Sequence, residues 1–258
     1  MSAPNIRTTF GALLLGALFA SILSGISNLQ TVNYYRSYKR DPSYIKALVF
    51  GVWLLDNVHT VFLWSGVWYY FVDSYGNPDK IDHIPWCIAL IVILTALITV
   101  FVHCFLAHRI FLLSKKNLFM TIPVLVLTVF RLACASVTTS KMLNYQSFEL
   151  LKLRARWIFT LGLAVSSAVD VLIAGLLVYL FRSNRTEIGR FNDILDKLLL
   201  YGLESGSLTC IGTVISLLCW VIIPQNLIFL GLYFVIGKLY ANSLFLTCEH
   251  PRRFIVRH

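Results

Sequence analysis

Apolar residues are gathered into seven long runs along the chain, and short polar segments separate these runs. Each run is about 20 residues or longer, the length that an α-helix needs to cross the hydrocarbon core of a bilayer. The pattern therefore predicts seven transmembrane helices, which we place near Phe10–Leu29, Ala47–Val72, Pro85–Leu113, Leu118–Thr138, Trp157–Phe181, Leu198–Ile223 and Leu227–Leu246.

The polar segments between the runs leave no room for a soluble domain. We predict one membrane domain over residues 1–258, an all-α bundle of seven transmembrane helices. Only Pro224-Gln225-Asn226 separates the last two runs, which makes them antiparallel neighbours. The first run could instead belong to a cleaved signal peptide, but it is long for a signal core, and this favours a retained helix.

Composition supports a membrane protein, because 58% of the 258 residues are hydrophobic and only 13% are charged. Soluble domains carry about 25% charged residues. The net charge of +10 comes from basic residues between the apolar runs, so anionic lipid headgroups at cytosolic loops are the expected partners, and nucleic acid is not. None of the six cysteines shows C-x-x-C spacing, and the sequence indicates no metal site, disulfide framework or cofactor.

Basic residues also predict the orientation of the bundle, because they gather in cytosolic loops. They are most frequent after the first, third and fifth runs and in the C-terminal tail, which places the N-terminus outside and the C-terminus in the cytosol. The segment after the fourth run argues against this orientation with Lys141, Lys152, Arg154 and Arg156. The sequon at Asn184 falls on the predicted cytosolic side.

Several ionisable and amide side chains lie inside the apolar runs, where they rarely face lipid. We expect them to face the interior of the bundle and to form either a polar network that fixes helix packing or a site for a ligand or an ion. The candidate set is Asp56, Asn57, His59, His103, Asp170, Glu204, Lys238 and Asn242. Arg131 is a further base within a run.

Depth in the bilayer narrows the possible pairs in this set. At a rise of about 1.5 Å per residue, Asp56 and Lys238 both lie near the midplane, and Asp170 lies at a similar depth or slightly deeper. A lysine at that depth cannot easily reach the interface, so we expect an acid or a water-filled cavity to meet it. If the last helix lies beside the first two, as in the usual seven-helix ring, Asp56 is the first candidate partner; Asp170 and Glu204 are the alternatives.

Small residues recur at every fourth position of the first run, a pattern that lets helix backbones approach closely in lipid. This stripe could serve as a dimer face, but packing within one bundle is favoured, and the oligomeric state stays open. The stripe consists of Ala12, Gly16, Ala20, Ser24 and Asn28.

Several short motifs resemble an uncharacterised seven-span membrane family of basidiomycete fungi, domain of unknown function 6534. The motifs run from Trp53 to Thr60, from Ala168 to Asp170, from Arg182 to Thr186 and from Phe234 to Leu244, and the resemblance is densest over residues 168–253. Phe181 and Gly237 depart from the family pattern, as do Cys248-Glu249-His250. The resemblance implies a fungal multi-pass membrane protein and implies no activity.

The favoured function is that of a receptor-like or sensing membrane protein without enzymatic activity, which takes a small ligand or a lipid. The first alternative is a transporter or channel for a small solute or ion that uses Asp56, His59 and Lys238. A more distant alternative is an intramembrane lipid-modifying enzyme, for which Asp56, His59 and His103 could supply metal ligands, although the last run contains no histidine. The sequence does not indicate which membrane holds the protein.

Overall fold

The computed structural model describes the backbone of residues 6–77, 80, 82–184, 192–223 and 226–249, and the side chains of these residues except 6–8, 181, 184, 192–205 and 249. Within these ranges the chain is helical, and the only β-type contact is an isolated bridge between His83 and Ser147. The helices are α1 (Ile6–Ser37), α2 (Ser43–Trp68), the π-helical turn η1 (Tyr69–Asp73), α3 (Trp86–Leu113), α4 (Leu118–Tyr145), α5 (Phe148–Arg154), α6 (Arg156–Asn184), α7 (Asn192–Ile222) and α8 (Ile228–Glu249).

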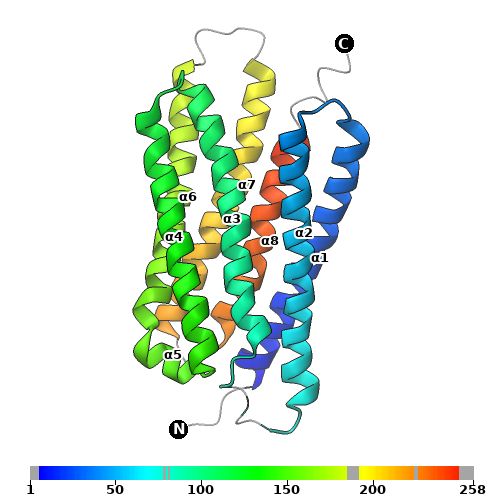
Figure 1. The fold of residues 1–258 in the computed structure, drawn as a ribbon, viewed down its shortest axis with the longest axis vertical. Coiled ribbons are helices and arrows are strands. Elements are labelled where there is room, and N and C mark those ends of the chain that lie inside the picture. Colours follow the sequence, from blue (N-terminus) through cyan, green and yellow to red (C-terminus); the bar gives the residue numbers. More distant parts are fainter. Residues whose placement is uncertain (1–5, 78–79, 81, 185–191, 224–225, 250–258) are drawn as a thin grey trace.

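Six of these helices, α1, α2, α3, α4, α6 and α8, are long and apolar enough to cross a membrane. Figure 1 shows them side by side with α7, in one elongated bundle. Among the described side chains α7 carries a shorter apolar stretch, Gly206–Ile222. The chain is thus an integral multi-pass membrane protein by length and composition, and the seventh span at Leu198–Ile223 stays a prediction.

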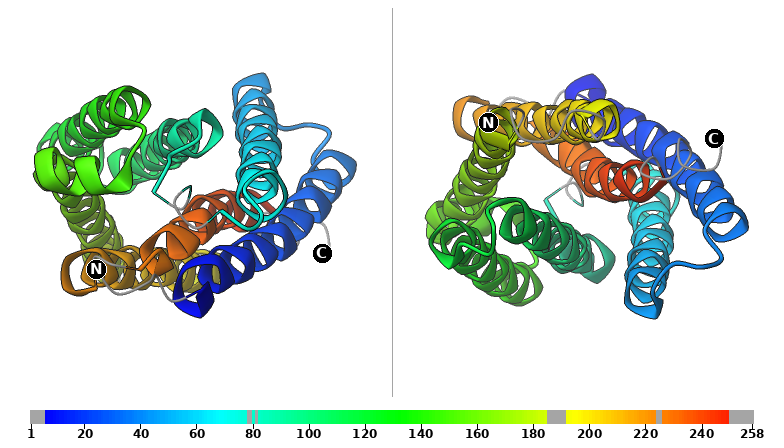
Figure 2. Two further views of the ribbon diagram at one scale, coloured as in Figure 1. Left: turned by 90° about the horizontal axis from the view of Figure 1, so that it is seen from below. Right: turned by 90° about the horizontal axis from the view of Figure 1, so that it is seen from above.

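The last helix, α8, lies inside the bundle and not only in a ring around it. It contacts α1 and α2, as expected, and it also contacts α3 and α7. The end-on views in Figure 2 show α8 enclosed by the other helices. Its apolar window is 78% buried, the highest share among the candidate spans. Polar side chains of α8 are therefore surrounded by protein, which is what they need in an apolar bilayer.

Glycine allows the closest helix contact, between α1 and α8. A Cβ atom at Gly16 would lie 2.4 Å from the carbonyl oxygen of Gly231, and a Cβ at Gly231 would lie 2.4 Å from the oxygen of Ala12. Backbone therefore packs directly on backbone, which only residues without a side chain permit. The predicted small-residue stripe is used within the chain at this point.

Two loops meet at the end of the bundle where α1 begins, shown at the bottom of Figure 1. The carboxylate of Asp82 accepts hydrogen bonds from the Ser147 hydroxyl and from the Glu149 N–H at 2.8 Å. The Ile84 N–H donates to the carbonyl of Gln146 at 2.9 Å. These bonds attach the α2–α3 connection to α5, a short helix that the hydrophobic pattern does not predict.

Candidate functional site

The structure brings together Asp56 and Lys238, the first candidate pair of the sequence analysis. The ammonium of Lys238 lies 2.9 Å from Oδ1 of Asp56, and both side chains are 0% exposed. The same ammonium donates to the backbone carbonyl of Asp56 at 2.6 Å and to the hydroxyl of Thr60 at 2.7 Å. Two of these contacts are hydrogen bonds and the third is an ion pair, and all three oxygens belong to α2.

Helix α1 completes this first cluster through Ser24, the fourth member of the small-residue stripe. Its hydroxyl donates to Oδ2 of Asp56 at 2.9 Å and lies 3.0 Å from the Thr60 hydroxyl. Thr60 in turn donates to the carbonyl of Asp56 at 2.9 Å. We call Ser24, Asp56, Thr60 and Lys238 the ion-pair cluster; it joins α1, α2 and α8 at one point.

Three other candidates lie around the ion-pair cluster and form hydrogen bonds with residues outside it. Oδ1 of Asn28 accepts two hydrogen bonds, one from the Asn57 amide at 3.3 Å and one from the Trp53 indole at 2.6 Å. Asn242 donates to the carbonyl of Leu23 at 3.1 Å and so links α8 to α1. Nε2 of His59 lies 3.2 Å from the Thr95 hydroxyl on α3, and its Nδ1 has no hydrogen-bond partner among the described residues.

A second cluster joins α3, α4, α6 and α8, and we call it the histidine cluster. Nε2 of His103 lies 3.2 Å from Oδ1 of Asp170, and Nδ1 lies 3.2 Å from the Thr128 hydroxyl. The Tyr240 hydroxyl donates to Oδ2 of Asp170 at 2.6 Å and lies 3.1 Å from Ser166. Asp170 therefore bonds His103 and Tyr240, and it does not take part in the pair with Lys238.

The hydrogen bonds of Thr128 constrain the protons of this cluster. Its hydroxyl donates to the carbonyl of Val124 at 2.7 Å, so its oxygen can only accept from His103 Nδ1, which must carry a hydrogen. The contact between Nε2 and Asp170 then needs a second proton, either on the imidazole or on the carboxyl group. In both forms the His103–Asp170 pair has no net charge.

Arg131 and Tyr240 belong to this region but were not in the candidate set. The Arg131 guanidinium lies over the Tyr240 ring, 5.5 Å from its centroid, and the residue is 6% exposed. The sequence carries one signal for Tyr240, because it lies seven residues after Tyr233 and so on the same face of α8. The side chain of Glu204, the remaining candidate, lies outside the described residues.

A surface groove follows the outer face of α2 and reaches the ion-pair cluster from one side. Its walls combine hydroxyl groups, two indoles and one acid, from Thr60, Val61, Trp64, Ser65, Trp68 and Asp73. Thr60 is the residue that belongs to both the groove and the cluster. Among the described residues, no three His, Cys, Asp or Glu side chains gather where they could hold a metal ion.

Comparison with known proteins identifies one family. Residues 166–248, from α6 to α8, match a family of unknown function, DUF6534. The match covers less than half of the chain and includes Asp170 and Lys238. No curated protein and no solved structure matches the chain. The family is similar to this part of the chain and carries no activity that could be transferred.

Proposed function

We propose that the protein is a receptor-like sensor with seven membrane spans and without enzymatic activity, and that it binds a small neutral molecule dissolved in the membrane. The outer N-terminus and cytosolic C-terminus expected from the basic residues are part of this proposal. The arrangement in Figure 1 supports an odd number of spans, because α1 begins at the end of the bundle opposite to the end of α8.

One observation carries the ligand proposal: Thr60, whose hydroxyl contacts the buried Lys238 ammonium, is also one of the residues that line the groove on α2. A molecule that binds in this groove lies against Thr60. Its oxygen can replace the Thr60 oxygen as an acceptor for Lys238. Thr60 thereby connects the groove to the ion-pair cluster.

The groove also suggests the kind of ligand. Thr60 and Trp68 are eight residues apart, so the groove is about 12 Å long between them. Trp64 and Trp68 offer flat apolar walls, and the one charged wall residue, Asp73, disfavours an acidic ligand. A neutral molecule with one hydroxyl or carbonyl group and a short apolar body fits these walls.

Ligand binding would act on the fold through α8. The ion-pair cluster holds α8 to α1 and α2, and a ligand that binds better when Lys238 has released Thr60 shifts the population toward that state. The groove reaches the cluster laterally, along the outer face of α2, which favours a sensor over a transporter, because transport needs access to the charged groups from both sides of the membrane.

The test uses 8-bromo-1-octanol with protein purified in lipid nanodiscs, since bromine quenches tryptophan on contact. We expect saturable quenching of Trp64 and Trp68, whereas 1-bromooctane, which lacks the hydroxyl, quenches without saturation. Thr60→Val should remove the saturable component. Thr31→Val is the matched control, because the Thr31 hydroxyl also bonds a carbonyl four residues earlier, at 2.9 Å, but lies on α1 away from the groove.

Equal, unsaturable quenching by both compounds in the native protein would contradict the ligand proposal. Flux of protons or cations through proteoliposomes that depends on Asp56 would contradict the sensor and support the transporter instead.

A further inference from the structure

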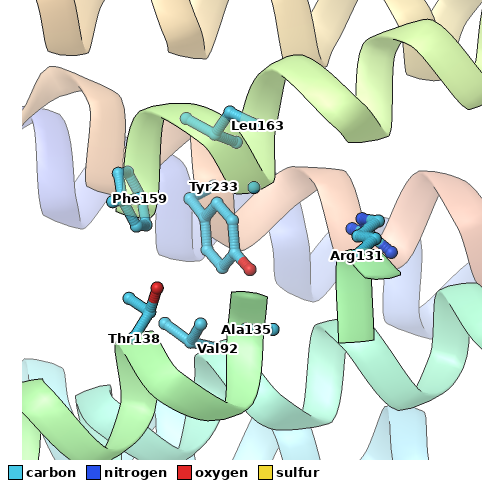
Figure 3. A pocket seen from close by; sticks show the side chains of 8 residues that line it. Val92, Arg131, Ala135, Thr138, Phe159, Leu163 and Tyr233 are labelled. Atoms are coloured by element: carbon cyan, nitrogen blue, oxygen red, sulfur yellow. The ribbon is translucent and has the colours of Figure 1, made fainter. Parts of the chain in front are cut away.

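A small cavity lies beside the histidine cluster, between α3, α4, α6 and α8, and is shown in Figure 3. Its volume is about 20 Å³, enough for one water molecule or one monoatomic ion. Apolar side chains form most of the wall, and the polar groups on it are Arg131, Thr138 and Tyr233. The lining residues are Val92, Arg131, Ala135, Thr138, Phe159, Gly162, Leu163 and Tyr233.

Arg131 is the unusual member of this wall, because its charge is buried and has no acidic partner among the described side chains. The residue is 6% exposed, and within the described side chains no carboxylate lies within 4.0 Å of its guanidinium. Its guanidinium lies over the face of the Tyr240 ring. A guanidinium has five N–H donors, and the ring accepts no conventional hydrogen bond from them. Donors left unsatisfied in an apolar interior are costly.

The sum of the buried charges also indicates that Arg131 lacks a counter-charge among the described residues. The Asp56–Lys238 pair is neutral as an ion pair, and the His103–Asp170 pair is neutral in either of its proton arrangements. Asp170 already accepts from Tyr240 and contacts His103, so it has no direct bond to Arg131. The described buried groups therefore carry one excess positive charge, located at Arg131.

One other polar group of the cavity, the Tyr233 hydroxyl, can complete an anion site. Figure 3 shows the Tyr233 hydroxyl directed into the space between Thr138 and Arg131, where it can donate. The Thr138 hydroxyl donates to the carbonyl of Cys134 at 2.8 Å, so it is occupied within its own helix. A spherical anion suits the small volume better than a carboxylate or a phosphate, which are larger.

We propose that this cavity is a binding site for a single halide ion of the size of chloride, held by the Arg131 guanidinium and the Tyr233 hydroxyl. The ion balances the excess positive charge of Arg131 and accepts hydrogen bonds from the N–H groups of its guanidinium. The site is separate from the groove at Thr60, and neither proposal depends on the other.

The experiment measures thermal unfolding of the full-length protein in neutral-lipid nanodiscs, with chloride replaced stepwise by gluconate at constant ionic strength. A ligand that binds only the folded state raises the unfolding midpoint with its concentration, so the native protein should unfold at higher temperature in chloride. Arg131→Gln should remove this dependence. Arg154→Gln is the matched control, because Arg154 is an exposed residue of α5 and should keep it.

A second variant keeps the test valid if Arg131→Gln does not fold. A Cβ atom at Gly162 would lie 3.6 Å from Cβ of Cys134, an ordinary contact, so Gly162→Ala fits the helices while it narrows the cavity. It should fold and bind chloride about tenfold more weakly.

Two outcomes overturn the proposal. A native protein whose stability is the same in chloride and gluconate would mean that water fills the cavity. The second outcome concerns Glu204, an acid that is not part of the proposed site. If Glu204→Gln abolishes the chloride response as fully as Arg131→Gln does, the response depends on a pair of charges that includes Glu204 and not on the cavity alone.

Discussion

Replacing Lys238 with methionine tests the ion-pair cluster most directly. Methionine keeps a long unbranched side chain and removes only the ammonium group. Two oxygens of Asp56, at 2.9 and 2.6 Å, and the Thr60 oxygen at 2.7 Å then lose their shared donor. The carboxylate of Asp56 stays buried with one remaining hydrogen bond, from Ser24.

The size of the effect separates a true ion pair from an ordinary polar contact. Removing one partner of a buried ion pair costs about 3–5 kcal/mol, because the other charge is left without compensation. Hydrogen bonds between membrane helices average about 0.6 kcal/mol. Since both side chains are 0% exposed, we expect Lys238→Met to lower the free energy of unfolding by the larger amount.

The measurement is a double-mutant cycle by equilibrium unfolding in mixed lipid–detergent micelles. Asp56→Asn alone leaves the lysine unpaired and should also destabilise strongly. The double variant buries no charge, so it should be at least about 2 kcal/mol more stable than the sum of the single losses predicts. Lys39→Met, at an exposed position after α1, is the control and should change little.

A loss of only about 0.6 kcal/mol for Lys238→Met would show that the ammonium contributes no more than a neutral hydrogen bond. Strictly additive single losses would show that the two charges do not interact. Either result would refute the reasoning from burial and distance.

Two further predictions concern packing and orientation. Gly231→Ala should cost about 1–3 kcal/mol of unfolding free energy in the same assay, because its Cβ would meet the Ala12 carbonyl oxygen at 2.4 Å, whereas Gly25→Ala meets nothing within 4 Å and should be close to neutral. In a eukaryotic host, Asn184 should carry no glycan, and an N-terminal epitope should be accessible on intact cells or sealed vesicles of outer-face orientation; glycan at Asn184 would reverse the proposed orientation.

The sequence was informative where depth limits the possible contacts. Lys238 lies near the midplane, and a buried charge there needs an opposite charge, so an acid at a similar depth could be anticipated as its partner. The choice of Asp56 over Asp170 also required the assumption that the last helix lies beside the first two. The all-helical fold and most helix positions follow from the length of the apolar runs in the same way. The short helix α5 could not be anticipated, because loop contacts to Asp82 help to hold it in place.

The histidine cluster could not be assembled from the sequence, for a geometric reason. His103, Asp170 and Tyr240 lie on three different helices, and their contact depends on how each helix is rotated and which helices are neighbours. Apolar runs that are hydrophobic on all sides contain little information about rotation. The inner position of α8, in contact with α1, α2, α3 and α7, was likewise not determined by depth.

This inner position gives α8 a particular role, because both clusters depend on it. Lys238 and Tyr240 are two residues apart, which on an α-helix separates their side chains by about 200°, so they point to opposite sides of α8. Lys238 bonds α2, and Tyr240 bonds Asp170 on α6. A rotation or shift of α8 that loosens one bond must therefore displace the other. A ligand at Thr60 and an anion at Arg131 would each act on the same helix from opposite sides, and this shared helix is the physical connection through which one site could influence the other.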